Sequence, residues 1–232
     1  MRDLFVIVGL PCSGKTTILK NFCNRRYSFE YFTNDTVCRQ VMDLFGVAPY
    51  FSIADAERWK QLDTLGNVAQ AKYWLYVVAL LRIRGEVAFS DGYLYYFEEE
   101  REILEAAARK VWPDLRIHYL HLTPAVDTLN MMRQTKGILP VTEEGVRAQL
   151  ANFALDFFEA SIRDEGELVR HITSVIGPLQ ERSSPSASMW VQWIAPTFGR
   201  EPTPIKEEGV SPDCNPRVPL VRRLMRSLKF RG

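Results

Sequence analysis

The chain has 232 residues, of which 47% are hydrophobic, and this is enough for one α/β domain with an appendage. The net charge is +1, but the first part of the chain is slightly acidic, which argues against a general electrostatic attraction to nucleic acid and leaves a local basic groove open. No apolar stretch is long enough to span a membrane. The four cysteines lack C-x-x-C spacing, which argues against a zinc site or a disulfide framework and predicts a cytoplasmic protein with reduced thiols.

Charge is distributed unevenly along the chain. Residues 1–176 hold 20 Lys and Arg against 23 Asp and Glu, a balance of −3. Residues 177–232 hold 9 basic and 5 acidic side chains, a balance of +4. The first three residues lead directly into a strand, so we expect no signal peptide. This pattern predicts a slightly acidic folded domain followed by a basic tail.

The first predicted strand, residues 4–8, leads into a loop of the form G-x-x-x-x-G-K-[ST], and a helix over residues 17–22 follows. Glycines at both ends of the loop let backbone N–H groups surround a phosphate, and the helix N-terminus adds partial positive charge. Lys15 would reach the β- and γ-phosphates of a nucleoside triphosphate, and the Thr16 hydroxyl would bind Mg²⁺. A glycine-rich turn that matches by accident is the alternative, and the strand and helix beside the loop disfavour it. The expected nucleotide contacts are Gly9, Pro11, Cys12, Ser13, Gly14, Lys15, Thr16 and Thr17.

A second strand is predicted over residues 28–33, and a helix with one apolar face follows it. Asp35 then stands just beyond the carboxyl end of a strand, where ligands bind in open α/β sheets. A carboxylate there is placed to accept the proton of an attacking hydroxyl, and Arg39, one turn later, to orient the acceptor or the phosphate. In the alternative interpretation, Asp35 only caps the helix and Arg39 is a solvated surface residue.

Residues 52–84 contain little Gly or Pro and repeat apolar side chains at helical spacing. They predict one long helix, or two helices joined near Gly66. The aromatic residues in this segment are expected to be core, with an acceptor pocket as the alternative. These residues are Trp59, Tyr73, Trp74 and Tyr76.

A third strand, over residues 86–91, ends in Asp91, which is the pattern of a Walker B strand. We expect Asp91 and Thr16 to hold the metal, and Asp91 could equally touch the acceptor. The competing interpretation is a turn residue before a glycine. Tyr93 follows at the same edge of the sheet and is a candidate acceptor contact.

The next elements are expected to support the fold. Residues 97–110 predict an amphipathic helix with acidic residues early and basic residues late, which matches the helix dipole. A fourth strand is predicted over residues 115–122, and its His118 and His121 have no partner at metal-ligand spacing, so both are expected to be structural. Pro124 is expected at the first position of a further helix.

Two helices then flank a short basic segment that ends in Gly137. Arg133 and Lys136 lie about one turn apart there, so both could close on the triphosphate and stabilise charge on its oxygens. The segment is therefore a candidate lid, with a plain surface loop as the alternative. After it we expect an apolar helix through residues 146–158 and a fifth strand over residues 168–172.

The folded domain is expected to span residues 1–177. Residues 178–219 are rich in Ser and Pro and predict an irregular linker, whose apolar run at residues 189–194 docks on this domain, a partner or a second subunit. Residues 220–232 predict a basic amphipathic helix that binds an anionic membrane surface, at the inner face of the membrane, or a partner protein. A basic solubilising tail is the alternative.

Several of these features together resemble the P-loop kinases, small kinases with an AAA-type ATPase domain. The group includes polynucleotide 5′-hydroxyl kinases, gluconate kinases, chloramphenicol phosphotransferases and zeta-type toxins. The resemblance covers about residues 1–175. It implies a three-layer α/β P-loop NTPase fold with a five-stranded parallel sheet in the order 2-3-1-4-5, a helical lid and an aspartate base. It rests on residues 9–17, Asp35 with Arg39, Asp91, and Arg133 with Lys136.

These features predict an ATP- and Mg²⁺-dependent kinase that phosphorylates a hydroxyl of a small metabolite or saccharide, including a glycan made at the membrane. A polynucleotide 5′-hydroxyl kinase is the alternative enzyme, so a nucleic-acid acceptor stays open. A nucleotide-gated binding module that signals through its tail is the alternative from a different class. The expected catalytic residues are Asp35, Lys15, Arg133 and Lys136, and the expected acceptor contacts are Asp35, Arg39, Asp91 and Tyr93.

Overall fold

The computed structural model describes residues 1–27, 29–46, 60–64 and 66–180 of the chain. All of them belong to the first of two compact units, Met1–Gln192, and the second unit, Trp193–Gly232, lies outside them. Trp59, nearly all of the expected linker and the expected C-terminal helix also lie outside the described residues, so what was predicted for them stays a prediction. Among the described helices, none combines the length and the apolar character that crossing a membrane requires.

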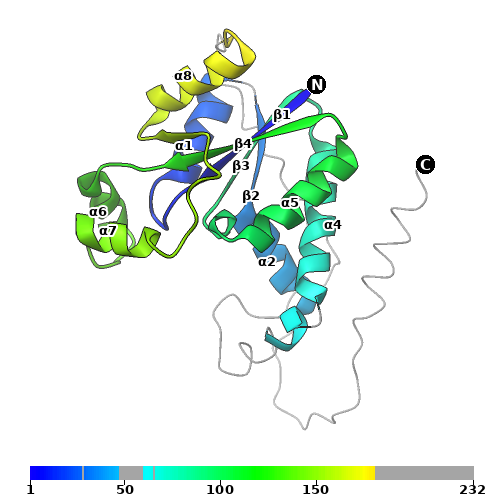
Figure 1. Cartoon of the computed structure of the whole chain (residues 1–232), viewed down its shortest axis with the longest axis horizontal. Helices are drawn as coiled ribbons and strands as arrows, with labels where there is room; N and C mark the ends of the chain where they lie inside the picture. Colours follow the sequence, from blue (N-terminus) through cyan, green and yellow to red (C-terminus); the bar gives the residue numbers. More distant parts are fainter. Residues whose placement is uncertain (28, 47–59, 65, 181–232) are drawn as a thin grey trace, which may run out of the picture. The chain divides into compact units, whose positions relative to one another are not determined.

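Five parallel strands form one sheet in the order β2-β3-β1-β4-β5 (Figure 1). β1 is central and its apolar side chains are buried on both faces, which explains its unbroken hydrophobic run. Because all strands are parallel, their carboxyl ends meet at one edge of the sheet. The predicted α/β fold class and strand order are therefore confirmed. The strands are β1 (Arg2–Val8), β2 (Glu30–Thr33), β3 (Val87–Gly92), β4 (Leu115–Leu122) and β5 (Ala160–Ile162).

Helices connect the strands and cover both faces of the sheet. Gly66 adopts a left-handed conformation directly before α4, which agrees with the alternative of two helices joined near this residue rather than one long helix. Residues 60–64 are helical, and the other described helices are α1 (Lys15–Lys20), the π-helix η1 (Asn21–Arg26), α2 (Asn34–Phe45), α4 (Asn67–Arg82), the 3₁₀-helix η2 (Leu94–Tyr96), α5 (Glu98–Val111), α6 (Val126–Gln134), α7 (Glu143–Leu150) and α8 (Glu165–Ile176).

The elements are arranged in three layers. Figure 1 shows α1 and α8 on one side of the sheet and α2, α4 and α5 on the other. Alternate strand residues on the first side meet the buried side chains of α1, η1 and α8 in one hydrophobic core. This core fixes α1, and with it the loop that precedes α1, against the sheet. Its members include Phe5, Ile7, Leu19, Phe22, Phe89, Leu120, Leu168 and Ile172.

The fifth strand is not where the sequence predicted it. Residues 168–172 lie within α8, and their buried Leu168 and Ile172, four residues apart, share one helix face. The Asp164 side chain caps this helix by accepting a hydrogen bond of 2.9 Å from the Glu167 N–H. β5 is instead the three-residue stretch Ala160–Ile162, which is too short to show a strand periodicity.

Two helix predictions also need correction. Pro124 precedes α6, whose N-cap is Ala125, so the proline is not the first residue of the helix. α7 ends at Leu150, so the prediction that an apolar helix continues through residue 158 is wrong. Phe153 follows α7 in irregular chain, and its aromatic contacts hold it against η2.

Candidate functional site

The loop between β1 and α1 is closed around the side chain of Lys15. Lys15 Nζ donates to the carbonyl oxygens of Gly9 at 2.8 Å and of Leu10 at 2.9 Å. Burial lowers the pKa of Lys15, and the carboxylates of Asp91 and Asp35 act in the opposite direction. The ammonium group therefore lies inside the loop, where the sequence predicts the phosphates of a nucleotide.

The loop requires glycine at its two glycine positions for different geometric reasons. Gly14, directly before α1, has a φ of 89°, a left-handed conformation that residues with a Cβ rarely adopt. A Cβ on Gly9 would lie 2.8 Å from Ser13 Oγ and 3.0 Å from the Leu122 carbonyl oxygen. The loop can close against the end of β4 because Gly9 has no side chain.

Thr16 and Asp91 meet at the start of α1. Thr16 Oγ1 donates a hydrogen bond of 2.7 Å to Asp91 Oδ2. The Asp91 side chain is buried, and its Oδ1 has no hydrogen-bond partner in the part of the chain that the structure describes. Burial raises the pKa of Asp91 to about 6, while the Thr16 hydrogen bond and the Lys15 charge oppose this rise.

Asp91 Oδ1 and the Thr16 hydroxyl oxygen fit the expected metal, Mg²⁺. Mg²⁺ prefers hard oxygen ligands and is commonly held by one or two carboxylates together with substrate phosphates and water. The unpartnered Asp91 Oδ1 and the neighbouring Thr16 hydroxyl supply two such oxygens. Within residues 1–27, 29–46, 60–64 and 66–180, no three His, Cys, Asp or Glu side chains gather as a metal-binding group.

Asp35 lies at the same edge of the sheet. The register of β2 and β3 pairs Thr33 with Asp91, and Asp35 follows two residues later with its side chain exposed. The charge of Asp35 raises the pKa of both Lys15 and Asp91. Arg39, one turn further along α2, is also exposed.

The cap of α2 decides one of the alternatives. Thr33 is the N-cap residue, and its Oγ1 accepts a hydrogen bond of 3.1 Å from the Thr36 N–H. The interpretation of Asp35 as the N-cap is therefore wrong. The cap leaves the Asp35 carboxylate available at the edge of the sheet.

The expected lid is the segment between α6 and α7, and side chains of α6 form hydrogen bonds with its backbone. Asn130 exchanges two hydrogen bonds with the backbone of Val141, at 2.7 and 2.8 Å, and Arg133 Nε donates to the Leu139 carbonyl oxygen at 2.7 Å. Lys136 is exposed, and its charge is close enough to the loop to lower the pKa of Lys15. The guanidinium of Arg133 contacts the segment itself, and the approach of Lys136 to the expected phosphates stays a prediction.

Tyr93 is part of an aromatic cluster beside Asp91. Its half-buried ring meets those of Tyr96, Phe97 and Phe153 edge-on, at centroid distances of 5.6, 6.1 and 6.0 Å. Phe153 in turn stacks on Tyr96 at 4.6 Å. The chain that follows α7 is therefore packed against the expected acceptor side of the site.

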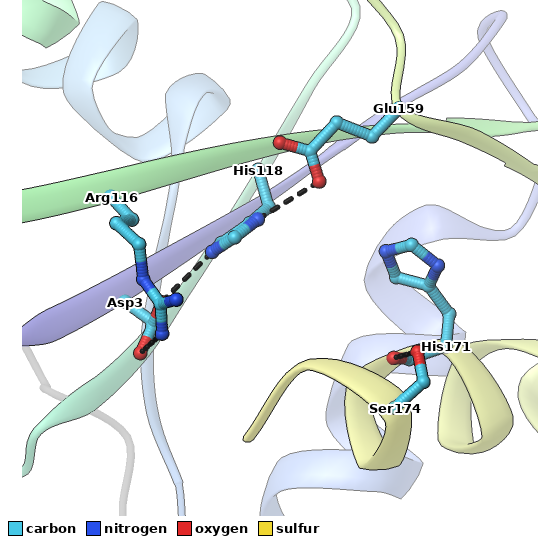
Figure 2. A network of polar contacts seen from close by, with 6 residues as sticks. All are labelled: Asp3, Arg116, His118, Glu159, His171 and Ser174. Carbon is cyan, nitrogen blue, oxygen red and sulfur yellow. Dashed lines mark hydrogen bonds and ion pairs between the residues drawn. The ribbon is translucent and has the colours of Figure 1, made fainter.

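The two histidines of β4 have structural partners. Figure 2 shows His118 between two carboxylates, with Nε2 2.8 Å from Asp3 Oδ1 and Nδ1 2.9 Å from Glu159 Oε2. Burial lowers the pKa of His121 to about 4, and its Nε2 lies 2.7 Å from the Tyr96 hydroxyl. Both arrangements agree with the structural role expected from the sequence.

An open depression with a volume of about 440 Å³ lies along β5 and α8, where no sequence pattern predicted a site. It begins next to the loop, because Thr123 in its wall directly follows Leu122, whose carbonyl oxygen faces Gly9. The wall is mostly polar or charged. Its residues are Thr123, Ala160, Ser161, Ile162, Arg163, Glu167, Arg170 and His171.

Sequence reasoning also missed a buried polar cluster next to Asp35, which we call the Asn34 cluster. Its members are Asn34, Lys72, Tyr76 and Glu100, all less than 9% exposed. A signal for it was present, because Lys72 and Glu100 fall on the apolar faces of α4 and α5. A charged residue on the buried side of a helix is seldom tolerated without a partner.

Comparisons with known proteins support the fold. No protein-family model matches the chain, and no curated protein matches it. The tunicamycin resistance protein of Deinococcus radiodurans is a similar solved structure, with 13% identity and a TM-score of 0.51 over 78% of this chain and 98% of that one. At this identity the likeness shows the fold alone.

Two further solved structures are more distant. A sugar kinase from Janibacter has 18% identity and a TM-score of 0.40 over 75% of this chain and 94% of that one. Kti12 from Chaetomium thermophilum, solved with ADP-AlF3, has 17% identity and a TM-score of 0.41 over 76% and 99%. TM-scores this low support no functional argument. The chain has the P-loop NTPase fold, as its strand order and loop also show.

Proposed function

We propose that this protein is an ATP- and Mg²⁺-dependent kinase that transfers the γ-phosphate to a hydroxyl of a small metabolite or saccharide. The observation that carries the proposal is the meeting of three groups at one edge of the sheet. These are the Lys15 loop, the hydrogen-bonded pair of Thr16 and Asp91, and the exposed carboxylate of Asp35. A carboxylate beside a phosphate site and a metal site can take the proton of an acceptor hydroxyl as it attacks the γ-phosphate.

Each residue has a defined role in this proposal. The loop backbone and Lys15 hold the donor phosphates, and Thr16 and Asp91 would hold Mg²⁺, which when bound neutralises charge on the β- and γ-phosphates. Asp35 accepts the proton of the attacking hydroxyl. Lys136 approaches the transferring phosphoryl group from the lid, so that catalysis consists of positioning and charge stabilisation.

Three further residues complete the proposal. Arg133 joins Lys136 on the phosphates once its bond to the Leu139 carbonyl is released. Arg39 orients the acceptor, because it lies one turn from Asp35 on the exposed side of α2. Tyr93 contributes one aromatic wall of the acceptor site, because it follows Asp91 at the same edge of the sheet and its ring packs against Tyr96.

The nucleoside is the part of the donor that the loop does not hold. The open depression along β5 starts beside the loop, and its wall is mostly polar or charged. We place the nucleoside there, with Thr123 nearest the phosphates and Arg163 at the end of β5.

The preference for a small acceptor rests on charge. Residues 1–176 carry a net −3, so a polyanionic acceptor would gain no general attraction from the folded domain. A polynucleotide 5′-hydroxyl kinase is the second candidate, because Arg39 at the acceptor side could bind a phosphate of the acceptor.

Labelled γ-phosphate transfer tests the proposal. The protein is incubated with labelled ATP and Mg²⁺, and is offered pooled sugars and metabolites in one arm and a 5′-hydroxyl oligonucleotide in the other. We expect label on a small molecule. Label on the oligonucleotide, with binding that weakens steeply with salt, would replace the preferred acceptor by the second candidate. Hydrolysis without transfer to any acceptor would contradict the proposal and favour a nucleotide-gated module.

A further inference from the structure

The Asn34 cluster fills the space between the start of α2 and the helices α4 and α5. Asn34 is fully buried, and its Nδ2 donates to Glu100 Oε1 at 2.9 Å and to the Tyr76 hydroxyl at 2.5 Å. The Tyr76 hydroxyl donates to the same Glu100 oxygen at 2.8 Å. The other Glu100 oxygen accepts from Lys72 Nζ at 2.5 Å. Both amide hydrogens of Asn34 can therefore be satisfied by groups on two other helices.

Stability alone is a weak reason for such a cluster. Removing a carboxylate and an ammonium group from water is costly, and their mutual attraction often does no more than offset that cost. Apolar residues of the same volume commonly serve as well. What a buried ion pair does supply is a fixed arrangement of the groups that it contacts, and here the group that it contacts is the Asn34 amide.

Asn34 is joined to the proposed site in two ways. It is the residue directly before Asp35 and begins α2. Its Cβ also packs against the backbone beside Asp91, since a Cβ added to Gly92 would lie only 2.6 Å from it. Any movement of Asn34 therefore shifts Asp35 relative to Asp91 and the loop.

We infer that Glu100 is a positioning residue, which holds the Asn34 amide and through it fixes Asp35 at the edge of the sheet. Lys72 pairs with one Glu100 oxygen, and the other Glu100 oxygen accepts from Asn34 and Tyr76 together. This inference rests on the proposed function for its kinetic consequence. Its structural consequence, an immobile start of α2, does not depend on the reaction.

Two double variants separate positioning from stability. Lys72→Met with Glu100→Leu removes the ion pair and the carboxylate acceptor of the Asn34 amide, and leaves only the Tyr76 hydroxyl as an acceptor. Lys72→Met with Glu100→Gln removes the same ion pair but keeps a side-chain oxygen within reach of Asn34. Neither variant leaves a buried charge without a partner. Glu99→Gln, on the exposed side of the same turn of α5, is the matched control.

The first readout is hydrogen exchange at the amides of residues 36–38. We expect the Leu variant to exchange roughly tenfold faster there than the wild type, and the Gln variant and the control to stay close to it. Equal exchange in the Leu and Gln variants would overturn the inference. Hydrogen exchange tests the positioning role of Glu100 even if the wild-type protein shows no transfer activity. Absence of transfer would contradict only the proposed function.

The second readout is phosphate transfer. A misplacement of about 1 Å can reduce a rate by about 100-fold, so we expect kcat of the Leu variant to fall by roughly that factor while ATP affinity is retained. The Gln variant should keep most of the activity, although both variants lose the ion pair. If kcat simply follows the melting temperature across the set, the cluster is structural and the inference is wrong.

Discussion

The Asp91 carboxyl is buried where ionisation is unfavourable, although the proposed metal site needs it ionised. Burial raises its pKa from 3.8 to about 6, and the Thr16 hydroxyl and the Lys15 charge only partly compensate. The protein thus keeps at the phosphate site an acidic group that would be easier to bury as an amide. Such a cost is common at functional sites, where pKa values depart from their usual range.

Asp91→Asn should therefore stabilise the metal-free protein in a pH-dependent way. Because the pKa of Asp91 is raised in the folded state, the folded wild type binds the proton more tightly than the unfolded chain does. Proton binding therefore stabilises the wild type fully below about pH 4, and this stabilisation is lost as the pH rises through about 6. The variant lacks this loss. Its advantage in free energy of unfolding should grow from near zero at about pH 4 to about 3 kcal/mol above about pH 7.

Urea unfolding without Mg²⁺, at several pH values across that range, measures the difference. Added Mg²⁺ with ATP should then stabilise the wild type and have a smaller effect on the variant, which has lost an anionic ligand. An advantage of equal size at every pH would show that the burial of the Asp91 charge is not its cause.

At the scale of single elements, α2 depends on its N-cap. The Thr33 hydroxyl satisfies the Thr36 N–H, and loss of such a cap typically costs about 1 kcal/mol. Thr33→Val, which keeps the shape but not the hydroxyl, should lower the free energy of unfolding by about that amount. Thr33→Ser keeps the cap and should have a much smaller effect. If Thr33→Val and Thr33→Ser unfold at the same urea concentration, the Thr33 hydroxyl does not stabilise α2 as an N-cap.

The lid can be tested by its charges. Lys136→Gln should lower kcat strongly, by roughly 100-fold for a group that stabilises developing charge, and should change ATP affinity little. Arg133→Gln should do the same if Arg133 leaves the Leu139 carbonyl when the lid closes. Arg147→Gln is the control, because Arg147 is 79% exposed and contacts Glu143 on its own helix. A kcat unchanged in the Lys136 variant would favour the plain surface loop.

The sequence predicted those elements whose pattern is local. The loop, the strand that carries Asp91 near its carboxyl end and the carboxyl-edge position of Asp35 follow from short runs of residues, and the structure has them there. β5 was missed because three residues show no periodicity, and the apolar residues of α8 were mistaken for a strand. The Asn34 cluster was missed because Glu100 lies 66 residues from Asn34, and no short pattern links them.

At the scale of the whole molecule, the basic C-terminal segment calls for a function of its own. Residues 217–232 hold six Lys or Arg and no acidic residue, and each such charge near an anionic membrane contributes about 1 kcal/mol to binding. We propose that this segment attaches the protein to an anionic surface. Deleting it should abolish sedimentation with phosphatidylserine vesicles and leave transfer to a soluble acceptor unchanged. Sedimentation that persists after the deletion would contradict the attachment.

The most direct test of the account compares Asp35→Asn with the wild type in two assays on the same preparation, ATP binding and γ-phosphate transfer. The substitution keeps the size of the side chain and removes the proposed base. We predict that ATP affinity changes little and that transfer falls by about 100-fold or more, as expected for a general base. Transfer that continues at the wild-type rate would contradict the proposed role of Asp35 and the kinase mechanism built on it.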